Sequence, residues 1–375
     1  MKKMKVAILT PASTLEIGGT NLNLSFFESM IRQRYDCTRY IPTGIFSLPF
    51  KKRFLRHPFR LLPPPLHYPL IQSCLKGLEH FDAIFSCSSH YPLNWLAYYA
   101  RKSQRNLRYI SYLDGLFLPS IYGDLHEQLY MWLMLKLWKK SLEDADLIGV
   151  ETRFLQALLW QNFRIKSTVV RSVIDPLHFK GNIAGEEMRS KLGLKEETPL
   201  ILYVDRIEYH KGIHLLIEIF KLVREKIPDA KLILVGRKTS PFYWKRIHRK
   251  FDNSIIYFES LPQVDLLECY EACTVFATAA TWEEGYSHTI VEAEAHAKPV
   301  VAFDIGAHTE VVKHQETGFL IQKENLGKFA SCLLTLLKDK KLNHDMGQKA
   351  RQWASYLVEV GIQEIQEFIK RIEML

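Results

Sequence analysis

The sequence predicts an α/β protein with two domains, each built on a doubly wound parallel sheet. Short apolar runs of strand length alternate with amphipathic segments of helix length along the chain, which is the pattern of repeated βαβ units. With 375 residues the chain is too long for one ordinary core. We therefore expect an N-terminal domain of residues 1–170, joined by the C-terminal helix of residues 357–375, and a second domain of residues 171–356 that faces it across a cleft.

Composition and cysteine usage are those of a globular protein of the cytoplasm. The chain is 47% hydrophobic and 24% charged, and no apolar run reaches the ~18–20 residues that span a bilayer. The opening MKKMKVAILT predicts a buried strand rather than a signal peptide. The six cysteines form no CxxC pair and no His cluster accompanies them at metal-ligand spacing, which indicates reduced, buried thiols.

The first predicted unit is a strand, Lys5–Thr10, followed by a loop with Gly18 and Gly19 and by a helix, Asn21–Arg34. Glycine lets backbone N–H groups approach a phosphate closely, so this loop is a candidate phosphate contact. A structural turn without a ligand fits the same residues. The loop contains no GxGxxG, which counts against a dinucleotide site.

Most of the positive charge of the chain lies near its start. Residues 1–60 hold eleven Lys and Arg against three acidic residues, a net +8 of the chain's +9. Residues 50–70 interleave these cations with Phe and Leu, which predicts contact with an anionic membrane surface. A solvated basic loop is the alternative. Nucleic acid is not expected, because no helix-turn-helix, zinc-finger or RNP pattern is present.

Polar residues follow the next two strands, where ligands bind in open α/β sheets. Asp114 comes two residues after the end of the strand Leu107–Tyr112 and before a glycine, so it is a candidate cleft residue; turn chemistry or an N-cap would also explain it. The other elements expected in this domain are the strands Asp82–Ser86, Asp146–Val150 and Thr168–Val173 and the helix Leu125–Leu142.

The second domain repeats the alternation. A loop with Arg206 and Lys211 follows its first strand, and two such cations suit a phosphate group, although ordinary surface charge explains two basic residues equally well. The expected strands are Leu200–Val204, Lys231–Val235, Ser254–Phe258, Thr274–Ala280, Val300–Phe303 and Gly318–Ile321, and the expected helices are Gly212–Glu225, Val264–Ala272 and a last one near Ile362–Met374.

The stretch Thr281–Val301 carries the most specific pattern in the chain. Glu284 and Glu292 are separated by seven residues and flank a glycine turn and a helix N-terminus. Free N–H groups at a helix N-terminus bind anions, and carboxylates accept hydrogen bonds from hydroxyls. The pattern therefore predicts a pocket for a ligand such as a nucleotide sugar. Two solvated glutamates on a surface helix are the alternative, and Glu283 and Glu294 are expected to be less buried than the motif pair.

Three segments together resemble a known family. They are ILYVDRIEYHKGIHLLIEIF, EEGYSHTIVEAEAHAKPVVAFDIGAHTEVV and VVRSVIDPLHF. They resemble the C-terminal domain of family 4 glycosyltransferases, which have the GT-B fold of two Rossmann-like domains. The resemblance is specific over residues 165–320 and diffuse over residues 1–164.

The resemblance implies roles for these residues. Arg206 and Lys211 would bind the donor diphosphate and neutralise the leaving group without a metal ion. Glu292 would bind the ribose, and Glu284 would hold the transferred sugar near its anomeric carbon. The family transfers sugar with retention of configuration through an oxocarbenium-like transition state. Further donor contacts would come from Gly18 and Gly19 in the first loop and from Gly285, Tyr286, Ser287, His288 and Thr289 at the helix N-terminus.

Two positions depart from the family pattern. Leu113 stands where many relatives have a histidine, so Asp114 is the candidate for the catalytic acceptor-side role. Arg237-Lys238-Thr239 replaces a segment that is often acidic, and we expect Arg237 to add a phosphate or base contact and to alter the nucleotide preference.

The expected function is that of a retaining, metal-independent glycosyltransferase without a cofactor. It would move a hexosyl group from a nucleotide-diphosphate sugar to a glycan or lipid-linked acceptor in the synthesis of cell-surface polysaccharide or glycolipid. We expect a cytoplasmic monomer or weak dimer that associates peripherally with the membrane. The alternatives are a GT-B enzyme of another reaction type, such as a nucleotide-sugar epimerase or a sucrose-type synthase, and a non-catalytic nucleotide-sugar-binding protein.

Overall fold

The computed structural model describes residues 3–9, 19–40, 75–87, 91–116, 125–179, 185–282 and 285–375. The chain forms two compact units, which are described separately below. The first comprises Met1–Ser172 with Gly361–Leu375, and the second comprises Val173–Val360. The sequence-based boundaries, 170/171 and 357, lie two and four residues before these limits. The cleft expected between the domains stays a prediction.

The first unit is a parallel sheet with the strand order β2-β1-β3-β4-β5-β6. The chain moves from β1 outward to β2 and then returns past β1 to β3, so the switch point of this doubly wound sheet lies between β1 and β3. Its strands are β1 (Lys5–Leu9), β2 (Asp36–Tyr40), β3 (Ala83–Cys87), β4 (Arg108–Leu113), β5 (Leu147–Val150) and β6 (Thr168–Val169). Its helices are α1 (Gly19–Arg34), α5 (Tyr91–Ser103), α6 (Leu125–Glu143) and α7 (Arg153–Phe163).

An aromatic cluster holds the C-terminal end of the chain on this sheet. Phe27 of α1 lies 5.2 Å from Phe85 of β3 and 5.2 Å from Tyr112 of β4, measured between ring centroids. Phe368, near the end of the chain, lies 6.5 Å from Phe85 and is fully buried. Burial of large aromatic rings contributes strongly to stability, which explains why this segment belongs to the first unit.

The second unit is a parallel sheet with the order β12-β11-β10-β7-β8-β9, the Rossmann order 3-2-1-4-5-6 read from the other edge. Its strands are β7 (Leu200–Val204), β8 (Lys231–Val235), β9 (Ile255–Phe258), β10 (Val275–Thr278), β11 (Val300–Phe303) and β12 (Gly318–Ile321). Its helical elements are η3 (Pro176–Phe179), α8 (Gly185–Lys191), η4 (Tyr209–Lys211), α9 (Ile213–Arg224), α10 (Pro241–His248), α11 (Gln263–Ala272), α12 (His288–Ala295), α13 (His308–Val311) and α14 (Leu326–Lys338).

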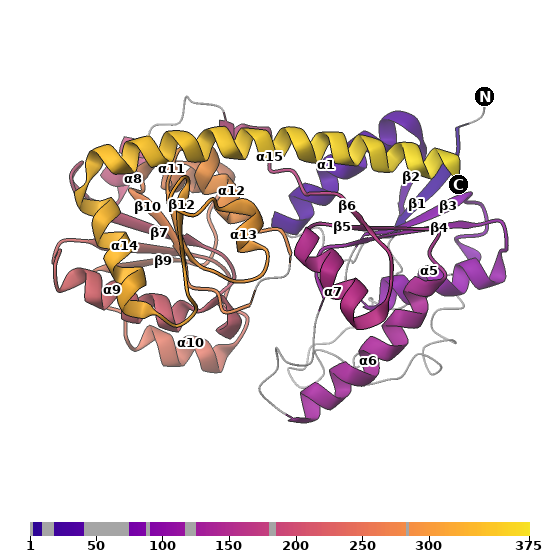
Figure 1. Ribbon diagram of the computed structural model, residues 1–375, viewed down its shortest axis with the longest axis horizontal. Coiled ribbons are helices and arrows are strands. Elements are labelled where there is room, and N and C mark those ends of the chain that lie inside the picture. Colours follow the sequence, from indigo (N-terminus) through magenta and orange to yellow (C-terminus); the bar gives the residue numbers. More distant parts are fainter. Residues whose placement is uncertain are drawn as a thin grey trace. The chain divides into compact units, whose positions relative to one another are not determined.

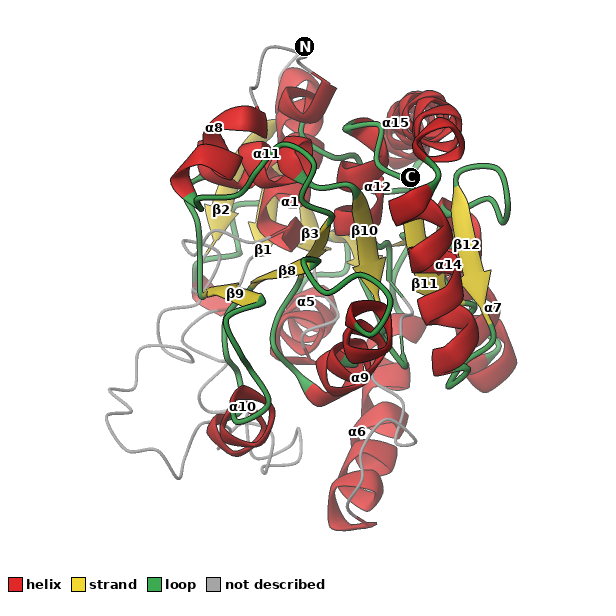
Figure 2. Cartoon of the chain, turned by 90° about the vertical axis from the view of Figure 1, so that its left-hand side faces the viewer, coloured by secondary structure: helices red, strands yellow, loops and turns green. Residues whose placement is uncertain are grey.

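Alternate residues of these strands enter two separate cores, as the strand period of two requires. Ile201 and Tyr203 of β7 pack with α9 and α14, whereas Leu200 and Leu202 pack with α11 and α12. The second sheet is therefore covered by helices on both faces (Figures 1 and 2). Strands buried on both faces read as continuous apolar runs, which is why β7, β8 and β11 have the predicted bounds.

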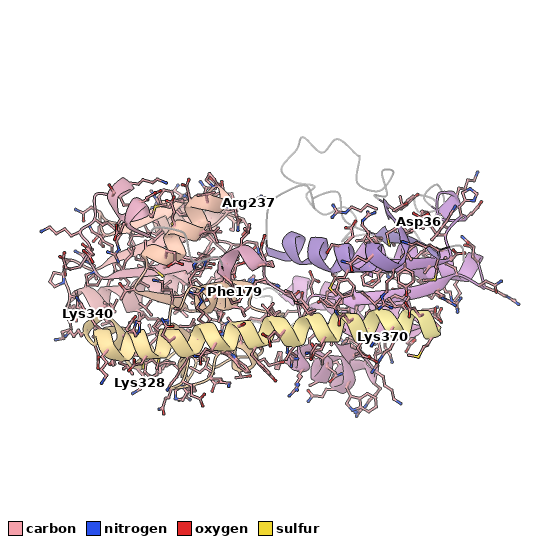
Figure 3. All side chains as sticks on the ribbon, turned by 90° about the horizontal axis from the view of Figure 1, so that it is seen from above. Asp36, Phe179, Arg237, Lys328, Lys340 and Lys370 are labelled. Carbon is pink, nitrogen blue, oxygen red and sulfur yellow. The ribbon has the colours of Figure 1, made fainter. Side chains whose placement is uncertain are left out.

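The last helix is much longer than expected. α15 runs without a break from Lys340 to Met374 (Figure 3), whereas the sequence predicted a helix near Ile362–Met374. Its residues up to Val360 belong to the second unit, and those from Gly361 onward belong to the first. In the second unit Trp353 anchors it, because the indole Nε1 donates a hydrogen bond to the Val311 carbonyl at 2.7 Å.

Two expectations from composition are met within the described part of the chain. None of its helices has the length and apolarity needed to cross a membrane. Cys37, Cys269, Cys273 and Cys332 are free and buried, as expected for reduced thiols.

Candidate donor-binding site

The site predicted from the sequence lies at the switch point of the second sheet, between the neighbouring strands β7 and β10. In open α/β sheets, ligands bind outside the carboxyl ends of the strands at this point. The backbone N–H of Thr281, after β10, donates to the His210 carbonyl, after β7, at 2.8 Å. Gly212 has φ +68°, and a Cβ there would lie 1.7 Å from the Ala279 carbonyl oxygen, so only glycine fits where the two loops meet.

The loop after β7 presents one buried and one exposed cation. Lys211 is buried, and its Nζ lies 2.8 Å from Oδ2 of Asp205. Burial would raise the pKa of Asp205, but the charges of Lys211 and Arg206 hold it below its usual value. The Arg206 side chain is 58% exposed and lies 3.2 Å from Glu208. Lys211 is thus fixed and partly neutralised, whereas Arg206 extends toward solvent.

The loop after β8 lies directly beside this one. The backbone N–H of Ile207 donates to the carbonyl of Arg237 at 2.9 Å, and a Cβ at Gly236 would lie 1.8 Å from the Asp205 carbonyl oxygen. The exposed Arg237 (Figure 3) therefore belongs to the same edge of the sheet as Arg206, and its role as a donor contact stays a prediction.

The α12 N-terminus offers fewer free donors than expected. The N–H of His288 already donates to the Tyr286 carbonyl at 2.9 Å. The Tyr286 side chain packs in the core, so only its backbone can face a ligand. The buried hydroxyl of Ser287 has no hydrogen-bond partner in the described structure and does not cap α12, as expected for a group that a ligand phosphate would satisfy. Gly285 is buried and Thr289 half-buried beside it.

Glu292 is a buried carboxyl group with a raised pKa. Its Oε2 accepts a hydrogen bond from the Tyr270 hydroxyl at 2.6 Å. Burial raises the pKa of Glu292 to about 7, although the Tyr270 bond acts in the opposite direction, and the charges of Asp175 and Asp205 raise it further. The influence of Asp205 links Glu292 to the cationic loop after β7.

The expectation that Glu294 is less buried than Glu292 is wrong. Glu294 is fully buried, whereas Glu292 is 8% exposed. The reason is that every residue of α12 from Ile290 to Ala295 is buried. Glu294 accepts a hydrogen bond from Thr317 at 2.7 Å, and burial raises its pKa well above the usual value.

The predicted site residues Gly18 and Glu284 lie outside the described residues, as do Glu283, whose lower burial stays untested, and the basic segment 50–70. Gly19 is the first residue of α1. No group of three or more His, Cys, Asp or Glu side chains in the described ranges could hold a metal ion; metal independence stays a prediction.

The predicted acceptor-side residue belongs to the first unit. Asp114 follows β4 directly and is half-buried. Leu113, in the place of the family histidine, is the last residue of β4 and packs in a hydrophobic cluster with Trp138 and Leu142. The chain therefore uses this position for its core, and Asp114 stays the candidate for the histidine's role.

Sequence reasoning missed the residues that surround Glu292. They are Tyr270 and Glu271 on α11, His296 at the end of α12, and His178 on η3. His178 and His296 are 118 positions apart but in hydrogen-bond contact. No local pattern marks them, because each follows from the packing of η3 and α11 on α12.

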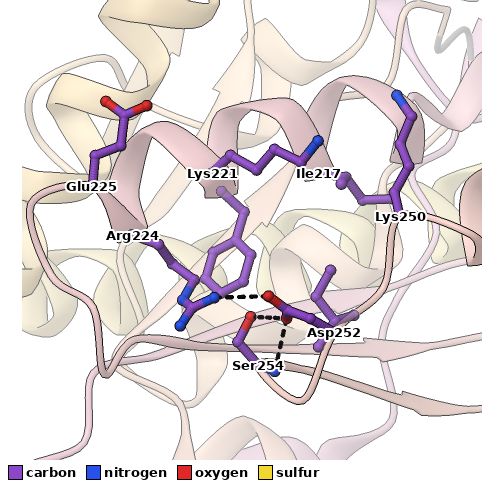
Figure 4. A pocket seen from close by; sticks show the side chains of 9 residues that line it. Ile217, Lys221, Arg224, Glu225, Lys250, Asp252 and Ser254 are labelled. Atoms are coloured by element: carbon purple, nitrogen blue, oxygen red, sulfur yellow. Dashed lines mark hydrogen bonds and ion pairs between the residues drawn. The ribbon is translucent and has the colours of Figure 1, made fainter.

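A separate pocket lies at the opposite edge of the second sheet (Figure 4). It has a volume of about 390 Å³ and is lined by the end of α9 and the turn before β9. Most of the charged side chains that line it are ion-paired, for Arg224 lies 2.8 Å from Asp252 and Lys250 lies 2.6 Å from Glu218. This pocket is distinct from the candidate donor site.

Comparison with known proteins agrees with this geometry. Residues 185–353, which contain both loops and α12, match the family model of glycosyl transferases group 1. A crystal structure of Alr3699/HepE of Anabaena in complex with UDP and glucose superimposes with a TM-score of 0.81 at 19% identity, over 99% of this chain and all of that one. The fold is GT-B.

Other GT-B proteins lead to the same conclusion. Sucrose-phosphate synthase of Thermosynechococcus elongatus has a TM-score of 0.79 at 17% identity, over the full length of both chains. D-inositol 3-phosphate glycosyltransferase of Corynebacterium efficiens is 27% identical over 230 residues, which are 58% of this chain and 54% of the relative. The first relatives are matched over only 48–58% of their own length. The predicted resemblance to GT-B glycosyltransferases is confirmed; retention and the role of the E-x7-E pair stay predictions.

Proposed function

We propose that this GT-B protein is a glycosyltransferase that moves a hexosyl group from a nucleotide-diphosphate sugar to a glycan or lipid-linked acceptor. The reaction retains the anomeric configuration, needs no metal ion or cofactor, and serves the synthesis of cell-surface polysaccharide or glycolipid. The matched family model and the UDP bound in the similar Anabaena protein support the donor class.

One observation carries the proposal: the switch point of the second sheet brings together cations, a hydroxyl and a buried carboxyl group that suit a nucleotide-diphosphate sugar. Arg206 and Lys211 supply positive charge for the diphosphate. The Ser287 hydroxyl at the start of α12 supplies a further donor. Glu292 supplies a buried carboxyl group for the ribose hydroxyls. A surface helix with ordinary charges would not bury Glu292 or leave the Ser287 hydroxyl without a partner.

The proposed step breaks the bond between the anomeric carbon and the leaving phosphate oxygen and forms the bond to the acceptor oxygen on the same face. Arg206, Lys211 and the α12 N-terminus stabilise the charge that grows on the leaving diphosphate. The proton of the acceptor hydroxyl passes to the leaving phosphate oxygen. Glu284 holds the transferred sugar, and Asp114 orients the acceptor hydroxyl as a replacement for the family histidine.

A thermal-shift screen of UDP-, GDP-, ADP- and TDP-glucose tests the donor. One of them at 100 times its Kd is expected to stabilise the protein by about 2.7 kcal/mol, which raises the melting temperature of a chain of this length by about 3 °C. Arg237→Ala is expected to weaken that donor selectively or to change the preferred base. Absence of a shift with every nucleotide sugar would contradict the proposal.

Turnover separates the proposed enzyme from a binding protein. Wild-type protein is expected to hydrolyse or transfer the bound sugar, and Glu284→Gln to lose that activity while it keeps its affinity for the nucleoside diphosphate. A wild type that binds the donor without turnover would favour the non-catalytic alternative, which the core position of Leu113 supports. The likeness to sucrose-phosphate synthase supports a sucrose-type transfer, and a sugar phosphate as acceptor is the test for it.

We also propose peripheral association with an anionic membrane surface. Among the described residues, the stretch 237–250 contains six Lys and Arg and no acid. Phe242, at the start of α10, is 89% exposed, and Lys245 and Arg249 on the same segment are exposed. Cations beside an exposed aromatic ring suit the interface of a membrane with anionic headgroups.

Vesicle sedimentation tests this surface. Wild-type protein is expected to bind vesicles that contain an anionic phospholipid and not vesicles of phosphatidylcholine alone. Lys245→Ala/Arg249→Ala is expected to weaken binding at least about 30-fold, since each cation contributes about 1 kcal/mol near such a surface. The matched control is Lys340→Ala/Lys341→Ala, which removes two exposed cations at the start of α15. Equal losses in both variants would indicate nonspecific attraction.

A further inference from the structure

Five buried or half-buried polar side chains of the second unit form a series of contacts that includes Glu292 of the candidate donor site. Glu271 Oε1 lies 2.6 Å from Nδ1 of His296, and the Nε2 of His296 lies 3.2 Å from Nδ1 of His178. The Nε2 of His178 lies 3.8 Å from Oε1 of Glu292, and Oε2 of Glu292 accepts from the Tyr270 hydroxyl. Two carboxyl groups are therefore joined through two imidazole rings.

The partners assign a direction to the hydrogen bonds. Burial would raise the pKa of Glu271, but its hydrogen bond with His296 and the charges of Lys298 and Arg351 hold this pKa below the usual value, so the carboxylate accepts a hydrogen bond from Nδ1–H of His296. When His296 is neutral, its Nε2 accepts a hydrogen bond from Nδ1–H of His178. Burial lowers the pKa of His178 to about 3, so His178 is neutral.

This direction places a lone pair of His178 opposite Glu292. The Nε2 of His178 has no proton in this tautomer and can only accept. Glu292 can satisfy it by donating from a protonated Oε1, after the 3.8 Å separation shortens by about 1 Å. The free site thus favours a protonated Glu292, yet sugar hydroxyls, which must donate, are bound best by a carboxylate.

We propose that His178 and His296 form a proton relay that takes the proton of Glu292 when ribose hydroxyls bind, and so position Glu292 as a carboxylate without loss of a proton to solvent. The inference rests on the proposed function, because the relay acts when the nucleotide sugar binds at the donor site. The proton leaves Oε1 of Glu292 for Nε2 of His178, and the proton on Nδ1 of His178 moves to Nε2 of His296. No proton enters or leaves the site.

After the proton transfer, neighbouring groups stabilise the new charges on His296 and Glu292. His296 becomes an imidazolium between the Glu271 carboxylate and the face of Tyr270, whose ring is stacked on it at 5.3 Å and 7°, an arrangement that favours a cation. His178 then donates from Nε2 to Glu292. Asp175 and Asp205 oppose a charge on Glu292, while Lys211 pairs with Asp205 and limits this repulsion.

Titration calorimetry with UDP-glucose at pH 6 in two buffers of different ionisation enthalpy tests the relay, since this donor does not itself titrate near that pH. Wild-type protein is expected to bind with release of less than about 0.1 proton. His178→Phe cuts the relay, so binding is expected to release about 0.9 proton and to tighten about tenfold between pH 6 and pH 8. His308→Phe is the control, because His308 is an equally buried histidine of the same unit that bonds to the Phe303 carbonyl.

Equal proton release by wild type and His178→Phe would overturn the relay while leaving the proposed function intact. Absence of binding to every nucleotide sugar would instead overturn the proposed function. The free protein offers a separate measurement, which also applies where His178→Phe does not fold. The ¹⁵N shifts of labelled histidines at pH 6 are expected to show His178 and His296 as neutral Nδ1–H tautomers, and a neutral Nε2–H tautomer of His178 would overturn the proposal.

Discussion

Glu292→Gln is expected to weaken nucleotide-sugar binding about 100-fold, because hydrogen bonds from two hydroxyls to a carboxylate contribute about 1.5–3 kcal/mol each. The same change is expected to stabilise the ligand-free protein at alkaline pH. The pKa of Glu292 is raised from 4.5 to about 7 in the folded state. A raised carboxyl pKa means that stability is lost as the pH rises from 4.5 through 7. At pH 8 the loss is about 3 kcal/mol, and glutamine, which does not ionise, avoids it.

Glu294→Gln is the matched control for this prediction. Glu294 lies on the same helix two residues further on, and its pKa is also raised by burial. It bonds to Thr317, away from the site, and glutamine keeps an acceptor for that bond. We expect higher stability at pH 8 in both variants, measured by thermal unfolding at pH 5 and pH 8, and weaker UDP-glucose binding only in Glu292→Gln. Equal loss of affinity in both would assign the effect to α12 as a whole.

The place of the candidate donor site in the fold could be predicted from the sequence because short-range patterns determine it. β7 and β8 are apolar runs buried on both faces, and their predicted bounds are those of the structure. The loop that follows β7 then had to lie at the carboxyl edge of the sheet, where Arg206 and Lys211 are found. The strand order that makes this edge a switch point follows from long-range pairing of β7 with β10, and the sequence holds no local signal for it.

The burial of charged residues was harder to predict from the sequence than that of apolar residues. Glu292 and Glu294 look alike in the sequence, and an isolated helix would present one of them to solvent. α12 instead packs against a sheet strand and against α15, so both carboxyl groups are buried, and only their partners distinguish them. The histidines beside Glu292 could not be found at all, because His178 and His296 meet only when η3 folds onto α12.

Elements at the margins of the sheets were also missed. β2 pairs only with β1, and of its residues Asp36–Tyr40 three are exposed and one is half-buried, so it lacks an apolar run. In α15 two glycines, Gly347 and Gly361, interrupt the helical pattern, and glycine lowers intrinsic helix propensity by about 1 kcal/mol. Packing of Trp353 in one unit and Phe368 in the other overrides this preference and extends the helix to Lys340.

Replacing Arg206 or Lys211, the two cations of the loop after β7, by alanine is expected to reduce activity in both cases but stability only for Lys211. Arg206 is 58% exposed, so Arg206→Ala should leave stability unchanged and reduce kcat/KM for transfer about 10²–10³-fold, the effect of removing one group that stabilises charge in the transition state. Lys211 is buried against Asp205. Lys211→Ala should cause a similar loss of activity and also lower the free energy of unfolding by about 3 kcal/mol, because it leaves a buried carboxylate without its partner.

The double variant Lys211→Ala/Asp205→Asn separates the two contributions of Lys211. Asparagine keeps the shape of Asp205 and removes the unpaired charge, so the double variant should regain most of the lost stability, measured by urea unfolding, and none of the lost activity. The pH dependence gives a second check. The pKa of Asp205 is lowered in the folded wild type, so its stabilisation is present above the unfolded-state pKa and is lost as the pH falls through the folded value. Lys211→Ala and Lys211→Ala/Asp205→Asn should both lack this loss of stability at acidic pH. If activity returned together with stability in the double variant, Lys211 would act only by holding the loop, and the diphosphate charge would rest on Arg206 and the α12 N-terminus.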